Sequence, residues 1–448
     1  MSEVMSAMSY ALDITEGQPQ GHAARSCLIG MRIGNEMGLS PELTSSLFYA
    51  LLLKDIGCSS NAAKFCYLIG NDDRHAKCEL KTYNWTNLGD NLKFLLNNVA
   101  PAAPLLKRAG MIARLAFRGQ RGAKELVQIR CERGANIAGH LGLSTETADA
   151  IRALDEHWDG HGHPLGLRGA EIPLLGRILG LSQTVEVFNN KHGFRAACEM
   201  AQQRSGTWFD PELVRIFLSF KNDESFWQSL TSADPATLTS QLEPENCIVL
   251  ADDGRLDRIA EGFAEVIDAK SPWTFRHSRG VAEISTGIAK IMGFNGEHLR
   301  MLNRAALLHD IGKLGVSNTI LDKPGKLTQE EMDVVKRHPH HTFEILSRVK
   351  SFSKFADLAA SHHERIDGKG YHRGLPGEQL STSVRILAVA DIYEALASKR
   401  PYRQDLSGEE VTTIMNKMIG HGICPHVYSA LQAYIAKDNG FVPVKLAA

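Results

Sequence analysis

The C-terminal half of the chain carries histidine and aspartate residues in patterns typical of metal ligands. One adjacent pair, His309 and Asp310, lies in LLHDIGKL (307–314), and two adjacent histidines, His362 and His363, open HHERIDGKGYHRGLPGE (362–378). Neighbouring side chains on a helix point about 100° apart, so these two histidines can serve different ions. The closely spaced glycines that follow allow a tight loop beside the ligands. The pattern predicts a metal-bearing helix followed by a loop that faces the substrate.

Five histidines and two aspartates of this half form one candidate set of metal ligands: His277, His309, Asp310, His338, His362, His363 and Asp391. Neutral imidazole together with carboxylate suits Fe, Mn, Zn or Ni better than Mg or Ca. The set contains no thiolate, which disfavours a structural zinc site. Because the set is too large for one tetrahedral ion, we expect two ions bridged by the Asp310 carboxylate. Such a pair activates water and polarises a phosphoryl oxygen.

Two more residues are expected to assist these ligands. Lys313 lies one helical turn after Asp310, where its ammonium group would meet a phosphate and offset its charge in the transition state; the alternative is a solvated lysine. Ligand histidines usually bond a carboxylate or carbonyl through the second ring nitrogen. Glu364 is the expected carboxylate partner, with Asp333 as another candidate.

The segments around these residues have the apolar spacing of helices. Apolar residues recur at i, i+3, i+4 and i+7 in SLFYALLLKDIG, IPLLGRILGLSQTVEVF, MLNRAALLHDIG and VRILAVADIYEALAS. Alternating strand patterns are scarce, and the best candidate is the short ENCIVLADDG (245–254). We therefore predict an all-α fold.

An internal repeat divides the chain into two copies of one helical domain. LLKDIGC (52–58) aligns with LLHDIGK (307–313) at an offset of 255 residues, which also places His22 on His277. Further on, residues 155–179 align with 363–387 at an offset of 208, so the first copy has an insertion of 47 residues between 59 and 130. Periodicity weakens over 221–256. We predict a first domain over 1–220, a connector over 221–256 and a catalytic domain over 257–448.

The first copy lacks most of the candidate ligands. It keeps His22 and Asp55, but the other positions carry Lys54 for His309, Arg130 for His338, Leu154 and Asp155 for His362 and His363, and Gln183 for Asp391; Cys58 stands for Lys313. The loop glycines and the RIL sequence are retained. We infer that the first copy kept the fold and lost the metal site.

Composition sets limits on the class of protein. The formal net charge is -1, so no overall charge steers the chain to nucleic acid or to an anionic membrane. No apolar run reaches the ~20 residues that span a bilayer, and the N-terminus lacks the pattern of a signal peptide. The 8 cysteines are scattered without a CxxC pair, which indicates reduced thiols. We expect a cytoplasmic protein.

The motifs of the second half resemble those of the HD-GYP subfamily of HD-superfamily metal-dependent phosphohydrolases. The resemblance rests on HDIGK, HPxxxxxIL, HHExxDGxGY, RILAVADIYEAL and RPYR, which follow in that order over about 257–440. The first half resembles the same family in degenerate form. The resemblance implies two tandem HD-type domains and a metal centre that cleaves cyclic di-GMP or cyclic GMP-AMP.

The same resemblance carries roles over to individual residues. It assigns metal ligation to all seven members of the candidate set, contact with phosphate to Lys313, and substrate contacts to Tyr371 and Arg400. Three positions depart from the family pattern. His372 replaces the third letter of GYP, Trp273 stands where three-metal members carry Glu, and Glu394 replaces the usual Asp. The Trp273 position favours two ions over three.

The leading hypothesis is a phosphodiesterase that hydrolyses a 3′–5′ bond of a cyclic dinucleotide with two divalent transition-metal ions, Fe or Mn before Zn or Ni. One alternative is a phosphohydrolase of another nucleotide. A second alternative is a non-catalytic sensor or scaffold that binds a cyclic dinucleotide. Candidate protein partners are a diguanylate-cyclase-type protein and a second copy of the chain.

Overall fold

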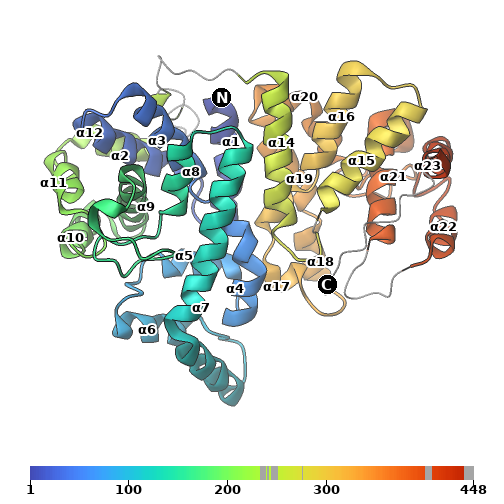
Figure 1. Cartoon of the computed structure of the whole chain (residues 1–448). Coiled ribbons are helices and arrows are strands. Elements are labelled where there is room, and N and C mark those ends of the chain that lie inside the picture. The colour runs from blue at the N-terminus through green and yellow to red at the C-terminus, as the bar shows by residue number, and fades with distance from the viewer. Residues whose placement is uncertain (233–238, 240–241, 244–250, 275, 399–405, 438–448) are drawn as a thin grey trace. The chain divides into compact units, whose positions relative to one another are not determined.

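The computed structural model of the chain describes all residues except 233–238, 240–241, 244–250, 275, 399–405 and 438–448, drawn in grey in Figure 1. The described part is all-α, as predicted, and contains isolated bridges but no strand. Most of the predicted short strand at 245–254 lies outside the described residues. No described helix is both long and apolar enough to cross a membrane.

The chain divides into two units. Unit 1 comprises Met1–Leu256 and Ser317–Thr319, and unit 2 comprises Asp257–Val316 and Ile320–Ala448. The helices up to residue 232 are α1 (Ser2–Thr15), α2 (His22–Glu36), α3 (Pro41–Leu53), α4 (Ala62–Ile69), α5 (Asp73–Leu80), α6 (Leu88–Asn98), α7 (Leu105–His140), α8 (Thr145–Arg152), α9 (Leu174–His192), α10 (Phe194–Gln203), α11 (Pro211–Ser219) and α12 (Glu224–Ser232), with 3-10 turns η1 (Cys58–Asn61) and η2 (Gly169–Glu171).

The later helices carry the candidate ligands. They are α14 (Asp253–Asp268), α15 (His277–Ile291), α16 (Gly296–Leu308), α17 (Asn318–Leu321), α18 (Gln329–Val335), α19 (His338–Ser347), α20 (Lys350–Ala360), α21 (Thr382–Ala397), α22 (Gly408–Asn416) and α23 (Pro425–Lys437), with 3-10 turns η4 (Ile311–Gly315) and η5 (Gly377–Gln379). In Figure 1 they run from yellow-green, at α14, to red, at α23.

The two units share one packing order. In unit 1, α2 packs on α3 and α9, and α8 packs on α3, α7 and α9. In unit 2, α15 packs on α16 and α21, and α20 packs on α16, α19 and α21. These are the same neighbours once the repeat is aligned. The apolar faces that the two copies share therefore form the same core, whether or not the metal ligands are present.

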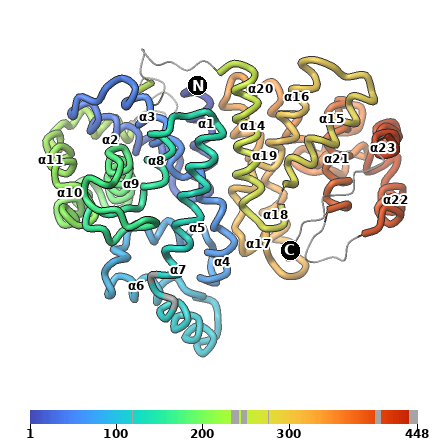
Figure 2. Tube along the Cα trace, viewed as in Figure 1, coloured from blue at the N-terminus to red at the C-terminus, as the bar shows by residue number. Residues whose placement is uncertain are grey.

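The inserted segment of the first copy forms a small core of its own. Helices α4 to α6 and the first part of α7 bury a separate apolar cluster made of Phe65, Ile69, Ala76, Phe94, Val99 and Ala100. Helix α7 is interrupted at Gly119, which has a φ of 46° that glycine adopts readily. Figure 2 shows this segment in colours from blue, at α4, to cyan, at the first part of α7.

The predicted connector contains a helix, which corrects the sequence prediction for 221–256. Helix α12 lies in this range, and its Trp227 stacks on Phe220 with ring centroids 6.0 Å apart. Phe226 packs edge-on against the same ring of Phe220, with centroids 5.4 Å apart. Burial of aromatic surface stabilises this short helix, although its sequence lacks a long apolar stripe.

Candidate metal centre

Four of the candidate ligands lie at or just after helix ends, where the backbone orients them. His277 and His338 open α15 and α19, His309 directly follows α16, and His362 comes two residues after α20. Three of the rings donate Nδ1–H to the carbonyl three residues earlier, each over 2.7 Å: His309 to Ala306, His338 to Val335 and His362 to Ala359. These bonds fix the tautomer and leave each Nε2 lone pair free for a metal.

The Asp310 carboxylate lies between two pairs of histidines. Its Oδ1 is 3.3 Å from Nε2 of His338 and 3.7 Å from Nε2 of His362. Its Oδ2 is 3.4 Å from Nε2 of His309 and 3.6 Å from Nε2 of His277. One carboxylate thus offers a different oxygen to each pair, which is the geometry that a bridging ligand needs.

Asp391 and His363 complete the cluster. Asp391 Oδ1 is 3.3 Å from Nε2 of His277, and its Oδ2 is 3.8 Å from Nδ1 of His363. Three overlapping groups have their ligand atoms within 4.8 Å of one another: His338, His362 and His363; His277, His309 and Asp391; and His309, Asp310 and His362. The fold therefore brings all seven candidate ligands together.

The buried polar atoms of this cluster fit a metal centre. Nε2 of His309 and Oδ1 of Asp310 are buried and have no hydrogen-bond partner among the described residues. Nε2 of His338 lies 3.1 Å from Nε2 of His362, and both rings already donate through Nδ1. Two lone pairs that face each other repel, and a cation bound by both removes the repulsion.

The protonation states also suit metal binding. Burial and the neighbouring imidazoles hold the pKa of His362 well below 6.5, and burial lowers the pKa of His363 to about 3. Burial raises the pKa of Asp310, but His309 and Lys313 outweigh it and hold that pKa well below 3.8. His362 and His363 thus present neutral imidazoles and Asp310 presents an ionised carboxylate, the forms that metals bind.

Glu394 orients one ligand, a role that the sequence analysis did not assign. Its Oε2 forms a close contact with Nδ1 of His277, and its Oε1 accepts a hydrogen bond of 2.5 Å from Ser398 Oγ. Burial lowers the pKa of His277, but Glu394, Asp310 and Asp391 outweigh it and raise that pKa well above 6.5. Glu394 lies three residues after Asp391 on α21, so its position one turn along the same helix face was the available signal.

Glu364 does not contact a histidine ring, which corrects the role expected for it. Its carboxylate accepts backbone N–H groups of Arg373 at 2.8 Å, Gly374 at 3.2 Å and Leu375 at 3.0 Å. Asp333 is exposed and accepts a hydrogen bond from Gln329. Backbone carbonyls hold Nδ1 of three ligand histidines and Glu394 holds Nδ1 of His277, so the Glu364 carboxylate is used instead to hold the glycine loop in place.

The residues expected to meet the substrate lie beside the cluster. Lys313 Nζ donates to Asp310 Oδ2 over 2.5 Å, and the Tyr371 ring centroid is 4.5 Å from that of His363. A cavity of about 260 Å³ is lined by Lys313, Trp273 and Lys323 among others. Trp273, which departs from the family pattern, thus forms part of the wall of this cavity. Arg400 lies outside the described residues.

The equivalent positions in unit 1 hold ion pairs. The Lys54 ammonium contacts Asp55, and Lys81 Nζ lies 3.3 Å from Asp55 Oδ1 and 3.2 Å from Glu16 Oε2. Glu16, Asp55 and Cys58 are close enough to share an ion. However, burial raises the pKa of the Cys58 thiol, so the thiolate that a metal requires is disfavoured.

Comparisons with known proteins agree with this geometry. The HD-domain family matches residues 103–213 and 261–427. The 3′3′-cGAMP-specific phosphodiesterase 3 of Vibrio cholerae is 40% identical over 432 residues, which cover 96% of this chain and 94% of that protein. The cyclic di-GMP phosphodiesterase response regulator RpfG of Xanthomonas campestris is 36% identical over 173 residues, 38% of this chain and 45% of that protein.

A solved structure extends the likeness to the fold. The crystal structure of a cyclic GMP-AMP specific phosphodiesterase from Vibrio cholerae matches with a TM-score of 0.66 and 37% identity, covering 97% of each chain. The fold and the His/Asp cluster define a metal-dependent phosphohydrolase of the HD type. The chain belongs to the HD-domain family, and its motifs place it in the HD-GYP subfamily.

Proposed function

We propose that the chain is a phosphodiesterase that hydrolyses a 3′–5′ bond of a cyclic dinucleotide at the unit 2 cluster, with two divalent ions. The observation that carries the proposal is the position of Asp310, whose two carboxylate oxygens face different pairs of histidines. Two ions account for seven ligands, and the mixed imidazole and carboxylate set favours Fe or Mn. When bound, such ions lower the pKa of water and offset charge on a phosphoryl oxygen.

The preferred substrate that we propose is 3′3′-cyclic GMP-AMP. A relative that matches 96% of this chain is named for that specificity, whereas the cyclic di-GMP phosphodiesterase RpfG matches 38% of this chain. Hydrolysis adds water to phosphorus, breaks the bond between phosphorus and the 3′ oxygen, and leaves a linear dinucleotide. A diguanylate-cyclase-type partner and a homodimer stay predictions.

The side chains around the cluster have separate tasks in this reaction. Lys313 is part-buried and reaches the edge of the cavity, so its ammonium can bind a phosphoryl oxygen and offset its charge. Tyr371 and Trp273 present aromatic faces on which a purine can stack. Glu364 holds the loop that contains Tyr371, so the face of that ring stays in place.

A nucleotide panel tests the proposal. The full chain, loaded anaerobically with Mn²⁺ or Fe²⁺, is incubated with 3′3′-cyclic GMP-AMP, cyclic di-GMP, mononucleotides and an alarmone, and products are separated by chromatography. We expect linear dinucleotide from cyclic GMP-AMP. Turnover of mononucleotides alone would establish the other phosphohydrolase activity instead. Less than one transition-metal ion per chain, with no turnover, would favour the sensor or scaffold.

A further inference from the structure

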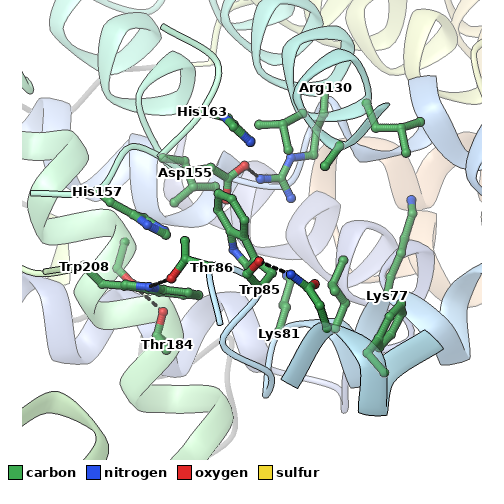
Figure 3. A pocket seen from close by; sticks show the side chains of 18 of the residues that line it. Lys77, Lys81, Trp85, Thr86, Arg130, Asp155, His157, His163, Thr184 and Trp208 are labelled. Atoms are coloured by element: carbon green, nitrogen blue, oxygen red, sulfur yellow. Dashed lines mark hydrogen bonds and ion pairs between the residues drawn. The ribbon is translucent and has the colours of Figure 1, made fainter. Parts of the chain in front are cut away.

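Unit 1 contains a cavity more than twice the volume of the one beside Lys313. Its volume is about 560 Å³, within the range of ordinary small-molecule sites. Residues of α5, α7 and α9 line it, together with the loop that follows α8 and the segment inserted into the first copy. Figure 3 shows it from close by.

The repeat places this cavity where unit 2 has its metal centre. Its lining includes the residues aligned with four of the metal ligands and with Tyr371, namely Arg130, Leu154, Asp155, Gln183 and His163. The first copy thus lost its ligands but kept a cavity over the same positions. The cavity of unit 1 therefore occupies the position of the substrate site without the metal ligands.

Aromatic rings form one wall of the cavity. Trp85 lies 4.8 Å from the His157 ring and 4.9 Å from the His163 ring, measured between centroids. His157 in turn stacks on Trp208 at 4.1 Å. Figure 3 shows Trp85, His157 and Trp208 gathered on one side. Such a wall suits a planar heterocycle, because stacking on aromatic rings is favourable for every nucleobase.

Two buried ring nitrogens at this wall lack hydrogen-bond partners. Nδ1 of His157 and Nε2 of His163 make no hydrogen bond to any described residue, although the two side chains are only 4% and 8% exposed. Burial lowers the pKa of His157 to about 3 and also lowers that of His163, so both rings are neutral at pH 7. A ligand that carries ring nitrogens and amino groups would satisfy both atoms.

The charged residues of the cavity are already paired with one another. Lys77 Nζ lies 3.2 Å from Glu16, and Arg130 contacts Asp155. Lys81 bonds Gln183 in addition to its two carboxylates. These cations are therefore largely neutralised, so the cavity has no strong requirement for a phosphate, and recognition must rest on the planar part of the ligand.

We propose that the unit 1 cavity binds a purine base, carried by a nucleoside, a nucleotide or a cyclic dinucleotide. The choice of a purine rests on the proposed function through the alignment of the two cavities. The aromatic wall and the unpartnered nitrogens are observations of unit 1 alone. The site is thus a second nucleotide-binding site in the chain, in addition to the metal centre.

Binding to a catalytically inactive full chain tests this site. The variant His309→Ala/Asp310→Ala prevents turnover, and calorimetry then measures binding of guanosine, GMP and 3′3′-cyclic GMP-AMP. We expect saturable binding that weakens about 10–100-fold when Trp85→Ala is added. His163→Phe keeps the ring but removes its nitrogens, so it should weaken binding while the thermal unfolding temperature stays near that of the parent.

Trp227→Phe is the matched control, because Trp227 packs on Phe220 and does not line the cavity. Binding of guanosine supports recognition of the base and shows that the ligand needs no phosphate. If only cyclic GMP-AMP binds and Trp85→Ala abolishes that binding, base recognition is supported and the ligand is the cyclic dinucleotide. No binding of any probe, or binding unchanged by both Trp85→Ala and His163→Phe, overturns the proposal. Because turnover is measured on the unmodified chain, failure of the proposed function gives a separate result.

Discussion

Lys54 and Asp55 form a buried ion pair in unit 1 at the positions that His309 and Asp310 occupy in unit 2. Burial raises the pKa of Asp55, but Lys54 and Lys81 outweigh it and hold that pKa well below 3.8. An ammonium group thus supplies the positive charge that a metal ion would supply in unit 2. This substitution explains how the first copy kept a buried carboxylate after its metal ligands were lost.

We predict that His309→Ala/Asp310→Ala removes both metal binding and turnover. The change deletes one imidazole and the carboxylate between the two histidine pairs, so turnover should fall at least about 10³-fold. Metal content, turnover and helical circular dichroism measure the effect. His298→Ala is the control, since His298 is an exposed residue of α16, the helix that His309 directly follows. Wild-type metal content in the double variant would contradict the assignment.

A change at Glu394 should weaken metal binding without abolishing the fold. Glu394→Gln removes the negative charge next to Nδ1 of His277, and loss of such a partner typically costs 10–100-fold in metal affinity. Titration with Mn²⁺ measures the affinity. Glu186 makes the same contact with His22 in unit 1, so Glu186→Gln should leave the affinity unchanged. Equal effects of the two variants would show that Glu394 acts only on stability.

Restoring one histidine to unit 1 should not restore its metal site. In the His309→Ala/Asp310→Ala background, we expect Lys54→His to bind no metal, because Arg130, Leu154 and Gln183 still replace ligands. The same change removes the buried ammonium group that pairs with Asp55. The free energy of unfolding should therefore fall by about 3 kcal/mol. Metal content and urea unfolding are the measurements, with the exposed Lys93→His as control. Detectable turnover would refute the account of the duplication.

His157 should make unit 1 less stable in mild acid. Burial, with Arg204 and the nearby histidines, lowers the pKa of His157 to about 3, below its value of about 6.5 in the unfolded chain. Below pH 6.5 the unfolded chain binds a proton at His157 that the folded chain does not bind. The free energy of unfolding is therefore highest above pH 6.5, and it decreases as the pH falls from 6.5 toward 3. At pH 5 the loss amounts to about 2 kcal/mol.

Urea unfolding between pH 7.5 and 5, followed by tryptophan fluorescence, measures this dependence. Four of the five tryptophans lie in unit 1, so the signal reports mainly on that unit. His157→Phe keeps an aromatic ring but cannot be protonated, so its stability should change less with pH. Identical pH dependence in the two proteins would exclude His157 as the group responsible.

Much of the fold could be predicted because apolar spacing and the repeat are local features of the chain. The helices that position His309 and Asp391 follow from periodicity, and the repeat identified which polar residues only one copy retains. The helix α12 within the predicted connector was not predicted. It is stabilised by aromatic contacts of Trp227 and Phe226, and such contacts leave no periodic apolar pattern in the sequence. The role of Glu364 in holding the loop could have been predicted from the repeat. The first copy retains Glu156 at the aligned position although it lacks the metal ligands, and Glu156 also accepts a backbone N–H of its loop.

The amino-acid sequence alone determined the all-α class, the duplication and the identity of the candidate ligands, because these depend on residue types and spacing. Only the tertiary structure decided that both oxygens of Asp310 face histidines, that Glu394 rather than Glu364 orients a ligand, and that unit 1 retains a cavity with an aromatic wall. These features depend on the distances between side chains of separate helices, which packing sets and which spacing along the chain does not encode.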